Sequence, residues 1–195
     1  ITNAPWGNFT YTIYWQGTKV SGAVTSLENA NITRTIPVSV YSLSFIFKDS
    51  AGAPLYASPT EITLTAPNGT RLRLTSFIIN QAQNGTWAVS SIIWQNNNVV
   101  PPELFMSINS NAVWSINCRV YSIDFTESFK DSRGVALYIS PSSFKLICPN
   151  GTTTFALSVG SYYLQNGTYR WKSVVWRGID VIPSPAPTFD PTGGS

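Results

Sequence analysis

The chain has 195 residues, of which 43% are hydrophobic and only 11% charged, and its net charge is +3. That length allows one large or two small domains, and scattered basic residues with so small a net charge argue against nucleic-acid binding. No run reaches the roughly 18 apolar residues that a transmembrane helix needs. The sequence begins with Ile1, which we interpret as the result of signal-peptide removal from a secreted protein.

The first predicted element is a strand at residues 7–15, GNFTYTIYW. One face carries Phe9, Tyr11, Ile13 and Trp15, and the other carries Asn8, Thr10, Thr12 and Tyr14. Alternation with period two indicates a β-strand with one buried face. The partner of this strand is not evident from its own sequence.

The rest of the chain contains one unit twice. VYSLSFIFKDS at 40–50 returns as VYSIDFTESFKDS at 120–132, and LYASP at 55–59 returns as LYISP at 137–141. PNGT, QNGT and a segment ending in Val-Val-Pro or Val-Ile-Pro also recur in the same order. The shift is 80 residues at the first match and 82 afterwards. Ordered matches at a nearly constant shift indicate a duplicated domain.

The repeat predicts four parts. Residues 1–19 form an N-terminal extension, 20–101 the first repeat, 102–183 the second repeat, and 184–195 a Pro- and Gly-rich tail. Within each repeat, short β-branched and aromatic segments alternate with turn signals such as Asn-Gly and the KDS turns, in which Asp caps backbone groups. We therefore expect an all-β fold of two tandem immunoglobulin-like sandwiches with an N-terminal donor strand.

Tryptophans mark the last long strand of each repeat. Strict alternation would place Trp87, Val89 and Ile93 on one face, so that Trp94 points the other way. Trp94 and its counterpart Trp176 are then expected either under a loop at the strand end or at a surface contact, and we favour the loop.

The sequence offers little for catalysis. It has no histidine, which removes the commonest general base and metal ligand, and its nine carboxylates are dispersed. No phosphate-binding or calcium-binding loop is present. We expect a protein that is not an enzyme and that needs no metal and no cofactor apart from covalent N-glycans.

The two cysteines, Cys118 and Cys148, both lie in strand-like segments. In a secreted protein we expect them to form a disulfide between neighbouring strands. The alternative is a pair of buried thiols in a core.

N-glycosylation sequons are unusually frequent, and every one ends in Thr. The six acceptors are Asn8, Asn31, Asn68, Asn84, Asn150 and Asn166. Asn-Gly-Thr is also a good turn followed by a strand start, which would account for four of them. Glycosylation accounts for all six and supplies the surface polarity that the charged residues do not.

With the leading strand, the duplication and the sequons together, the chain resembles a subunit of the archaeal thread, a glycosylated surface filament of Sulfolobus-like archaea. The D-x-x-G-x-x-L-Y-x-S-P segment with its PNGT and NGT turns also resembles carboxypeptidase-regulatory or transthyretin-like sandwiches.

The thread resemblance implies a secreted, extracellular structural subunit that polymerises head to tail with itself and can take part in adhesion. It also implies that the N-terminal strand is donated to a neighbouring subunit. Phe9, Tyr11, Ile13 and Trp15 would then fill pockets in the acceptor, whose identity the two similar repeats leave open. The alternative is a monomeric surface adhesin or carbohydrate-binding module, in which the strand completes its own first domain.

Overall fold

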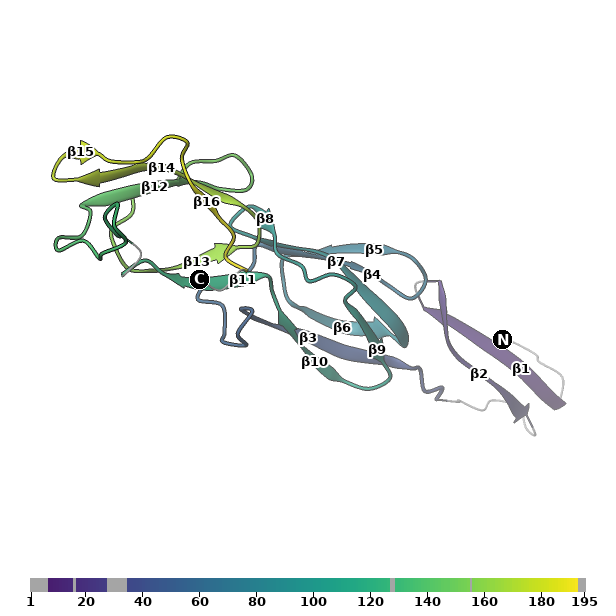
Figure 1. The fold of residues 1–195 in the computed structure, drawn as a ribbon. Coiled ribbons are helices and arrows are strands. Elements are labelled where there is room, and N and C mark those ends of the chain that lie inside the picture. The colour runs from purple at the N-terminus through teal and green to yellow at the C-terminus, as the bar shows by residue number, and fades with distance from the viewer. Residues whose placement is uncertain (1–6, 16, 28–34, 127–128, 155, 193–195) are drawn as a thin grey trace. The chain divides into compact units, whose positions relative to one another are not determined.

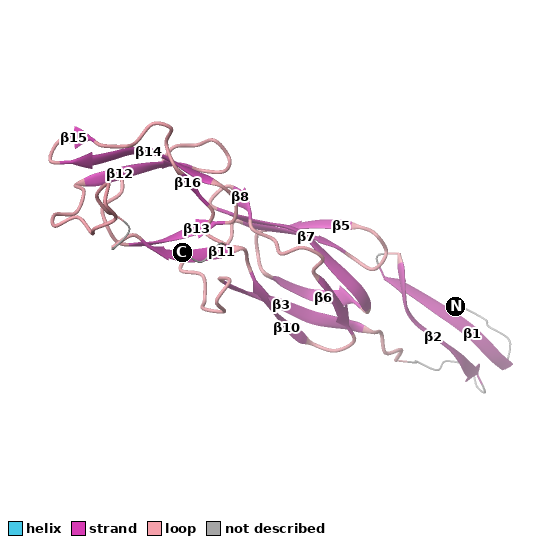
Figure 2. Ribbon diagram, viewed as in Figure 1, coloured by secondary structure: helices cyan, strands magenta, loops and turns pink. Residues whose placement is uncertain are grey.

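The computed structural model describes residues 7–15, 17–27, 35–126, 129–154 and 156–192. Every regular element in these ranges is a β-strand, which confirms the all-β fold class (Figure 2). No helix capable of crossing a membrane occurs in this part of the chain. The strands belong to two compact units. Unit 1 comprises Ile1–Ile46, Pro59–Ile93 and Pro102–Ile116, and unit 2 comprises Phe47–Ser58, Trp94–Pro101 and Asn117–Ser195.

Unit 1 contains two sheets of the repeat and an N-terminal hairpin (Figure 1). One sheet has the order β10-β3-β6, formed by β3 (Val40–Lys48), β6 (Ile78–Gln83) and β10 (Ala112–Asn117). The other has the order β5-β4-β7 with β9 also on β7, formed by β4 (Glu61–Thr65), β5 (Arg71–Leu74), β7 (Gly85–Trp94) and β9 (Phe105–Ile108). A short strand β8 (Asn97–Asn98) follows β7.

Both sheets of unit 1 contribute alternate residues to its core, as a sandwich requires. Leu43 and Phe45 of β3 are buried, as are Ile62 and Leu64 of β4 and Trp87 and Val89 of β7. Trp114 and Ile116 of β10 are buried in the same way, and the Trp114 ring lies 5.8 Å from the ring of Phe45. β10 is thus a full structural member of unit 1.

A bulge in β7 changes the face that its last residues present. Thr63 of β4 is opposite Ser91, whereas the next residue, Leu64, is opposite Val89, so Ser90 is an extra residue. Ile92 and Trp94 are consequently buried in place of Ile93. The expected outward orientation of Trp94 is wrong. Its expected position under a loop is confirmed, because its indole N–H donates to the carbonyl of Ala57 at 3.0 Å.

Unit 2 repeats part of this strand series. β11 (Val120–Asp124) pairs with β13 (Ser161–Gln165), and β12 (Ser143–Ile147) pairs with β14 (Tyr169–Trp176), which also pairs with β15 (Ile179–Asp180) and β16 (Thr188–Phe189). The core joins both sheets, with Phe125, Phe144, Leu146, Leu164, Tyr169 and Val174 at its centre.

The strand pairing divides the chain differently from the sequence repeat. β9 and β10 stand at the start of the second repeat, yet β9 pairs with β7 and β10 with β3. The Pro- and Gly-rich C-terminal tail contains a further strand, β16, which pairs with β14. Phe189 of β16 stacks on Tyr169 with ring centroids 5.5 Å apart. Each sandwich is therefore completed by strands that follow its own repeat in the sequence.

The KDS turns are capped as expected. The Asp49 carboxylate accepts hydrogen bonds from the N–H groups of Ala51 and Ala53, and Asp131 accepts from Arg133 and Val135 in the same way. These bonds satisfy backbone donors that the turn would otherwise leave unpaired.

Two Asn-Gly-Thr glycines allow the turn and the sequon to be tested separately. Gly85 has φ 126°, and a Cβ there would lie 2.9 Å from the ring of Pro67. Gly69 has φ 82° with nothing near its Cβ position. We expect Gly85→Ala to lower the free energy of unfolding by about 3 kcal/mol or more, through backbone strain and overpacking. Gly69→Ala should cost only about 1–2 kcal/mol.

Urea denaturation of both variants checks this difference. Each variant keeps an intact N-x-T sequon, so its acceptor asparagine remains available. Equal losses in the two variants would contradict the close approach of Pro67 to Gly85.

The exposed aspartates predict how stability depends on pH. The pKa of Asp131 is lowered by hydrogen bonds from Arg133, that of Asp124 by Thr126, and that of Asp190 by Thr192. A carboxyl whose pKa is lower in the folded state than its ordinary value of 3.8 stabilises the fold at pH values above 3.8. This contribution to the free energy of unfolding is lost as the pH falls through the pKa of the folded state.

Because the chain has no histidine, no side chain has an ordinary pKa between 5 and 8. We expect the urea midpoint to stay nearly constant from pH 8 to 5 and to fall only below about pH 4. Because these aspartates are exposed, each contributes little to the free energy of unfolding. A midpoint that fell markedly between pH 7 and 5 would contradict this prediction.

Candidate functional site

The N-terminal strand forms a hairpin. β1 (Gly7–Trp15) pairs antiparallel with β2 (Thr18–Leu27), from Gly7 opposite Leu27 to Trp15 opposite Thr18. Gly17, with φ 79°, lies in the two-residue connection, where a left-handed conformation favours glycine. The sequence analysis did not predict β2, whose TKVSGAVTSL sequence alternates less clearly. Within the described residues, β1 pairs with β2 alone, so it does not complete a sheet of its own sandwich.

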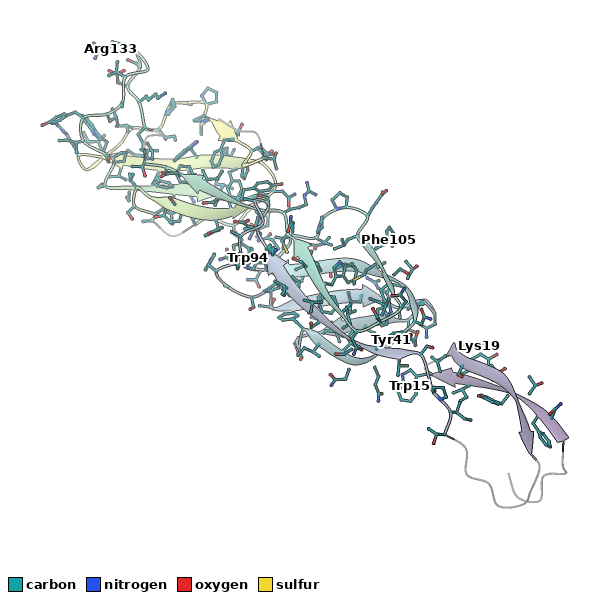
Figure 3. The ribbon with its side chains drawn as sticks, turned by 90° about the horizontal axis from the view of Figure 1, so that it is seen from below. Trp15, Lys19, Tyr41, Trp94, Phe105 and Arg133 are labelled. Atoms are coloured by element: carbon teal, nitrogen blue, oxygen red, sulfur yellow. The ribbon has the colours of Figure 1, made fainter. Side chains whose placement is uncertain are left out.

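The side chains of β1 follow the predicted alternation. Phe9, Tyr11 and Ile13 are partly buried, whereas Asn8, Thr10, Thr12 and Tyr14 are exposed. Trp15, labelled at the end of the strand in Figure 3, is 38% exposed. Its carbonyl accepts a hydrogen bond from the Gln83 side chain at 3.3 Å. Ile13 and Trp15 also line a small cavity of about 90 Å³ with Val38 and Val40. The hairpin thus presents half-covered aromatic residues along one face.

The two repeats differ at the edge of one sheet. In unit 1, β10 lies beside β3, and the N–H of Ser42 on β3 donates to the Asn111 side chain just before β10. In unit 2, β11 pairs only with β13 among the described residues. The β3 residue Leu43 is fully buried, but its counterpart on β11, Ile123, is only partly buried. At its start this edge of β11 is occupied, because the Val120 carbonyl accepts a hydrogen bond from the N–H of Ser50 at 2.8 Å. Beyond Val120, no described strand pairs with the edge of β11 that corresponds to the covered edge of β3.

Backbone direction shows which groups this edge presents. The N–H of Phe125 donates to Gly160, just before β13, at 3.0 Å. Successive N–H groups along a strand point to opposite sides, so those of Ser122 and Asp124 face away from β13. Both residues are exposed. A strand placed there would meet the backbone N–H and carbonyl of Ser122, for which the described residues provide no strand partner on that side.

β1 and β10 share a short pattern. Trp114-Ser-Ile116 in β10 places an aromatic residue and an isoleucine in the core of unit 1. Tyr11-Thr-Ile13 in β1 has the same order of aromatic, hydroxyl and isoleucine residues. The exposed face of β10 carries Val113 and Ser115, as that of β1 carries Thr10 and Thr12.

The described sequon asparagines lie at turns or near strand ends. Asn8, Asn68, Asn84 and Asn150 are exposed, and Asn166 is partly buried. Asn31 lies outside the described residues. Gly69 and Gly151 both have φ 82°, so a turn requirement does account for the glycine of PNGT. The turn requirement does not explain the sequon at Asn8, because Asn8 lies within β1.

The expected disulfide is not present. Cys118 and Cys148 are both reduced thiols. Cys118 lies between β10 and β11, with its N–H bonded to the carbonyl of Lys48, whereas Cys148 follows β12 with its N–H bonded to Thr152. The two segments belong to different sheets and are held by separate backbone contacts. Burial raises the pKa of the Cys118 thiol to about 12. The alternative of core thiols is correct for Cys118.

Comparison with known proteins gives no family. No family model and no curated protein matches the chain. Among solved structures, a streptococcal ancillary pilin is similar over 96% of this chain and 72% of its own, at 11% identity and a TM-score of 0.35. The TIE protein of Bacillus anthracis is similar over 94% of this chain and 39% of its own, at 13% identity and a TM-score of 0.33. These TM-scores are too low to support an argument from either protein.

Proposed function

We propose that the chain is a non-catalytic subunit of an extracellular filament, and that β1 of one copy completes the β11 edge of the next. The observation that carries the proposal is the difference between the two sandwiches. β3 has β10 beside it, whereas β11 has no strand at the equivalent position in the described residues. Because the donor and the acceptor are different surfaces of one chain, the contact is heterologous and propagates into an open filament.

Strand addition needs no rupture of the hairpin. β1 has one edge paired with β2, and its other edge is available within the described residues. Pairing of this edge with β11 would form a continuous sheet in the order β2, β1, β11, β13. Ladder hydrogen bonds would satisfy the backbone of both edges, and alternate side chains would enter the acceptor core.

The donor residues follow from the comparison of β1 with β10. Tyr11 would take the role of Trp114 and Ile13 that of Ile116, while Phe9 and Trp15 extend the same face. Burial of each such side chain contributes on the order of 1.5–3 kcal/mol before the costs of association. Ile123 of β11 is the half-covered residue against which they would pack.

Hydrogen exchange of the full chain with a synthetic 7–15 peptide tests the acceptor. We expect the peptide to slow exchange of the Ser122 amide, while a peptide carrying Ile13→Asp does not. The experiment is done at low protein concentration so that the chain's own β1 does not compete. Protection confined to other strands, or unchanged exchange at β11, would contradict the proposed edge. Protection of β11 before peptide is added would show that another segment of the same chain already covers it.

Glycosylation of the sequons is the second part of the proposal. Four acceptors are exposed in the described residues, and Asn8 lies on the face of β1 opposite Phe9, where a glycan has room during strand donation. We expect the intact mass of native material to exceed the polypeptide mass of 21.4 kDa by several glycans and to fall on deglycosylation. A native mass equal to that of the polypeptide would refute it.

A further inference from the structure

Unit 2 contains a cavity of about 750 Å³ that strand donation does not use. It lies along β13 and the segment that follows β12, and Tyr56 and residues 95–97 also line it. β13 pairs with β11, but no residue of β11 is among the described residues that line the cavity. Small-molecule sites occupy about 300–1,000 Å³. The cavity is therefore large enough for a ligand of two or three sugar rings.

The lining has a buried apolar part and a polar rim. Leu164 and Tyr169 are buried, and Leu157 packs against the same core. Amides and hydroxyls line the remainder, from Gln95, Asn96, Asn97, Asn150, Thr152, Thr154 and Ser161. None of the described residues that line the cavity is Asp, Glu, Lys or Arg. Such a surface suits an uncharged ligand that has both apolar faces and many hydroxyl groups.

Two tyrosines provide flat surfaces at the cavity. The Tyr56 and Tyr163 rings are 5.1 Å apart and inclined by 34°. Tyr56 is 60% exposed, yet its position is fixed from two sides. Its ring meets the edge of Trp94 at 5.6 Å, and its hydroxyl accepts a hydrogen bond from the Gln95 amide. An exposed aromatic ring held in place is a ready surface for the C–H face of a pyranose ring.

We propose that this cavity binds a neutral pyranose oligosaccharide, whose ring packs on Tyr56 and Tyr163 and whose hydroxyls bond to the amides of the rim. Asn150, an acceptor asparagine, lies in the lining itself. Its side-chain oxygen accepts from the N–H and hydroxyl of Thr152, which holds the amide at the rim. The saccharide can therefore be the glycan attached to Asn150 or one carried by another molecule.

The repeat supplies a matched control for the test. Tyr138 occupies the position in LYISP that Tyr56 occupies in LYASP, and it is 98% exposed and outside the cavity. The probes are chitotriose and maltotriose, added to the full chain made without glycans and followed by calorimetry. We expect millimolar or tighter binding of at least one probe. Tyr56→Ala should weaken it at least about tenfold, and Tyr138→Ala should leave it unchanged.

A second readout comes from Cys148, which lines the cavity. Bound saccharide should slow alkylation of Cys148. The proposal is overturned if neither probe binds at millimolar concentration, or if Tyr56→Ala binds as tightly as the parent chain. It is also overturned if the 7–15 peptide displaces the sugar, because the cavity would then be a strand acceptor. If the 7–15 peptide does not bind at β11 but the sugar still binds in the cavity, strand donation to β11 is rejected and the saccharide site is retained.

Glycosylated material distinguishes the two sources. If the Asn150 glycan occupies the cavity, native protein will not bind the probes, but native Asn150→Gln protein will. If both bind equally, the ligand comes from another molecule. Either result agrees with a saccharide site once the Tyr56 comparison has been made.

Discussion

Ile13→Asp is expected to abolish assembly of the full chain into filaments. In the proposed junction Ile13 enters the acceptor core, as Ile116 does within unit 1, where it is buried. Loss of the isoleucine removes about 1.5–3 kcal/mol from each junction. Burial of an unpaired carboxylate adds a further cost. The junction should therefore weaken at least about a hundredfold, which electron microscopy and sedimentation of concentrated protein would detect.

Thr12→Asp is the matched control, because Thr12 is exposed on the opposite face of the same strand. It introduces the same charge one residue away and should leave assembly intact. Urea denaturation of both variants must show that the sandwiches remain folded. Equal assembly by Ile13→Asp and the parent chain would rule out the proposed donor face. Equal loss in both variants would indicate a general charge effect in place of a pocket contact.

Trp114→Ala is expected to destabilise unit 1 by about 3–5 kcal/mol, the usual cost of truncating a buried tryptophan. Trp114 is 6% exposed and packs on Phe45 of the neighbouring strand. The loss is a large fraction of the stability of an ordinary domain. The loss in the free energy of unfolding measures how much unit 1 depends on the strand beside β3. It therefore indicates how much a strand donated to β11 would stabilise unit 2.

Val113→Ala is the control on the same strand, since Val113 is 61% exposed. Its effect should stay within about 0.5 kcal/mol. Urea unfolding followed by tryptophan fluorescence measures both variants. A loss below about 1 kcal/mol for Trp114→Ala would mean that β10 is dispensable to unit 1. The comparison between β3 and β11 would then no longer support strand donation.

Much of the fold was predictable from sequence because it depends on local patterns. The alternation of residues 7–15 predicted β1 with its face of Phe9, Tyr11 and Ile13. The glycines of PNGT predicted tight turns that do have positive φ. The duplication predicted two similar sets of strands, and β3 to β9 do recur as β11 to β16. The exception is β5, whose counterpart forms isolated bridges in the described residues. Period-two patterning and turn chemistry act within a few residues and are visible in one sequence.

The features that position the candidate site are non-local, and only the tertiary structure decided them. Which strand lies beside β3 depends on hydrogen bonds between segments about 70 residues apart, such as Ser42 with Asn111. The bulge at Ser90 turned Trp94 inward because one extra residue reverses every later side chain. The sequence predicted a disulfide between the two cysteines, but both are free thiols, and their backbone N–H groups bond to different segments. The sequence by itself determined an alternating N-terminal strand and two β-sandwich repeats. The structure determined that β10 completes the first, because strand order is set by packing across the whole unit.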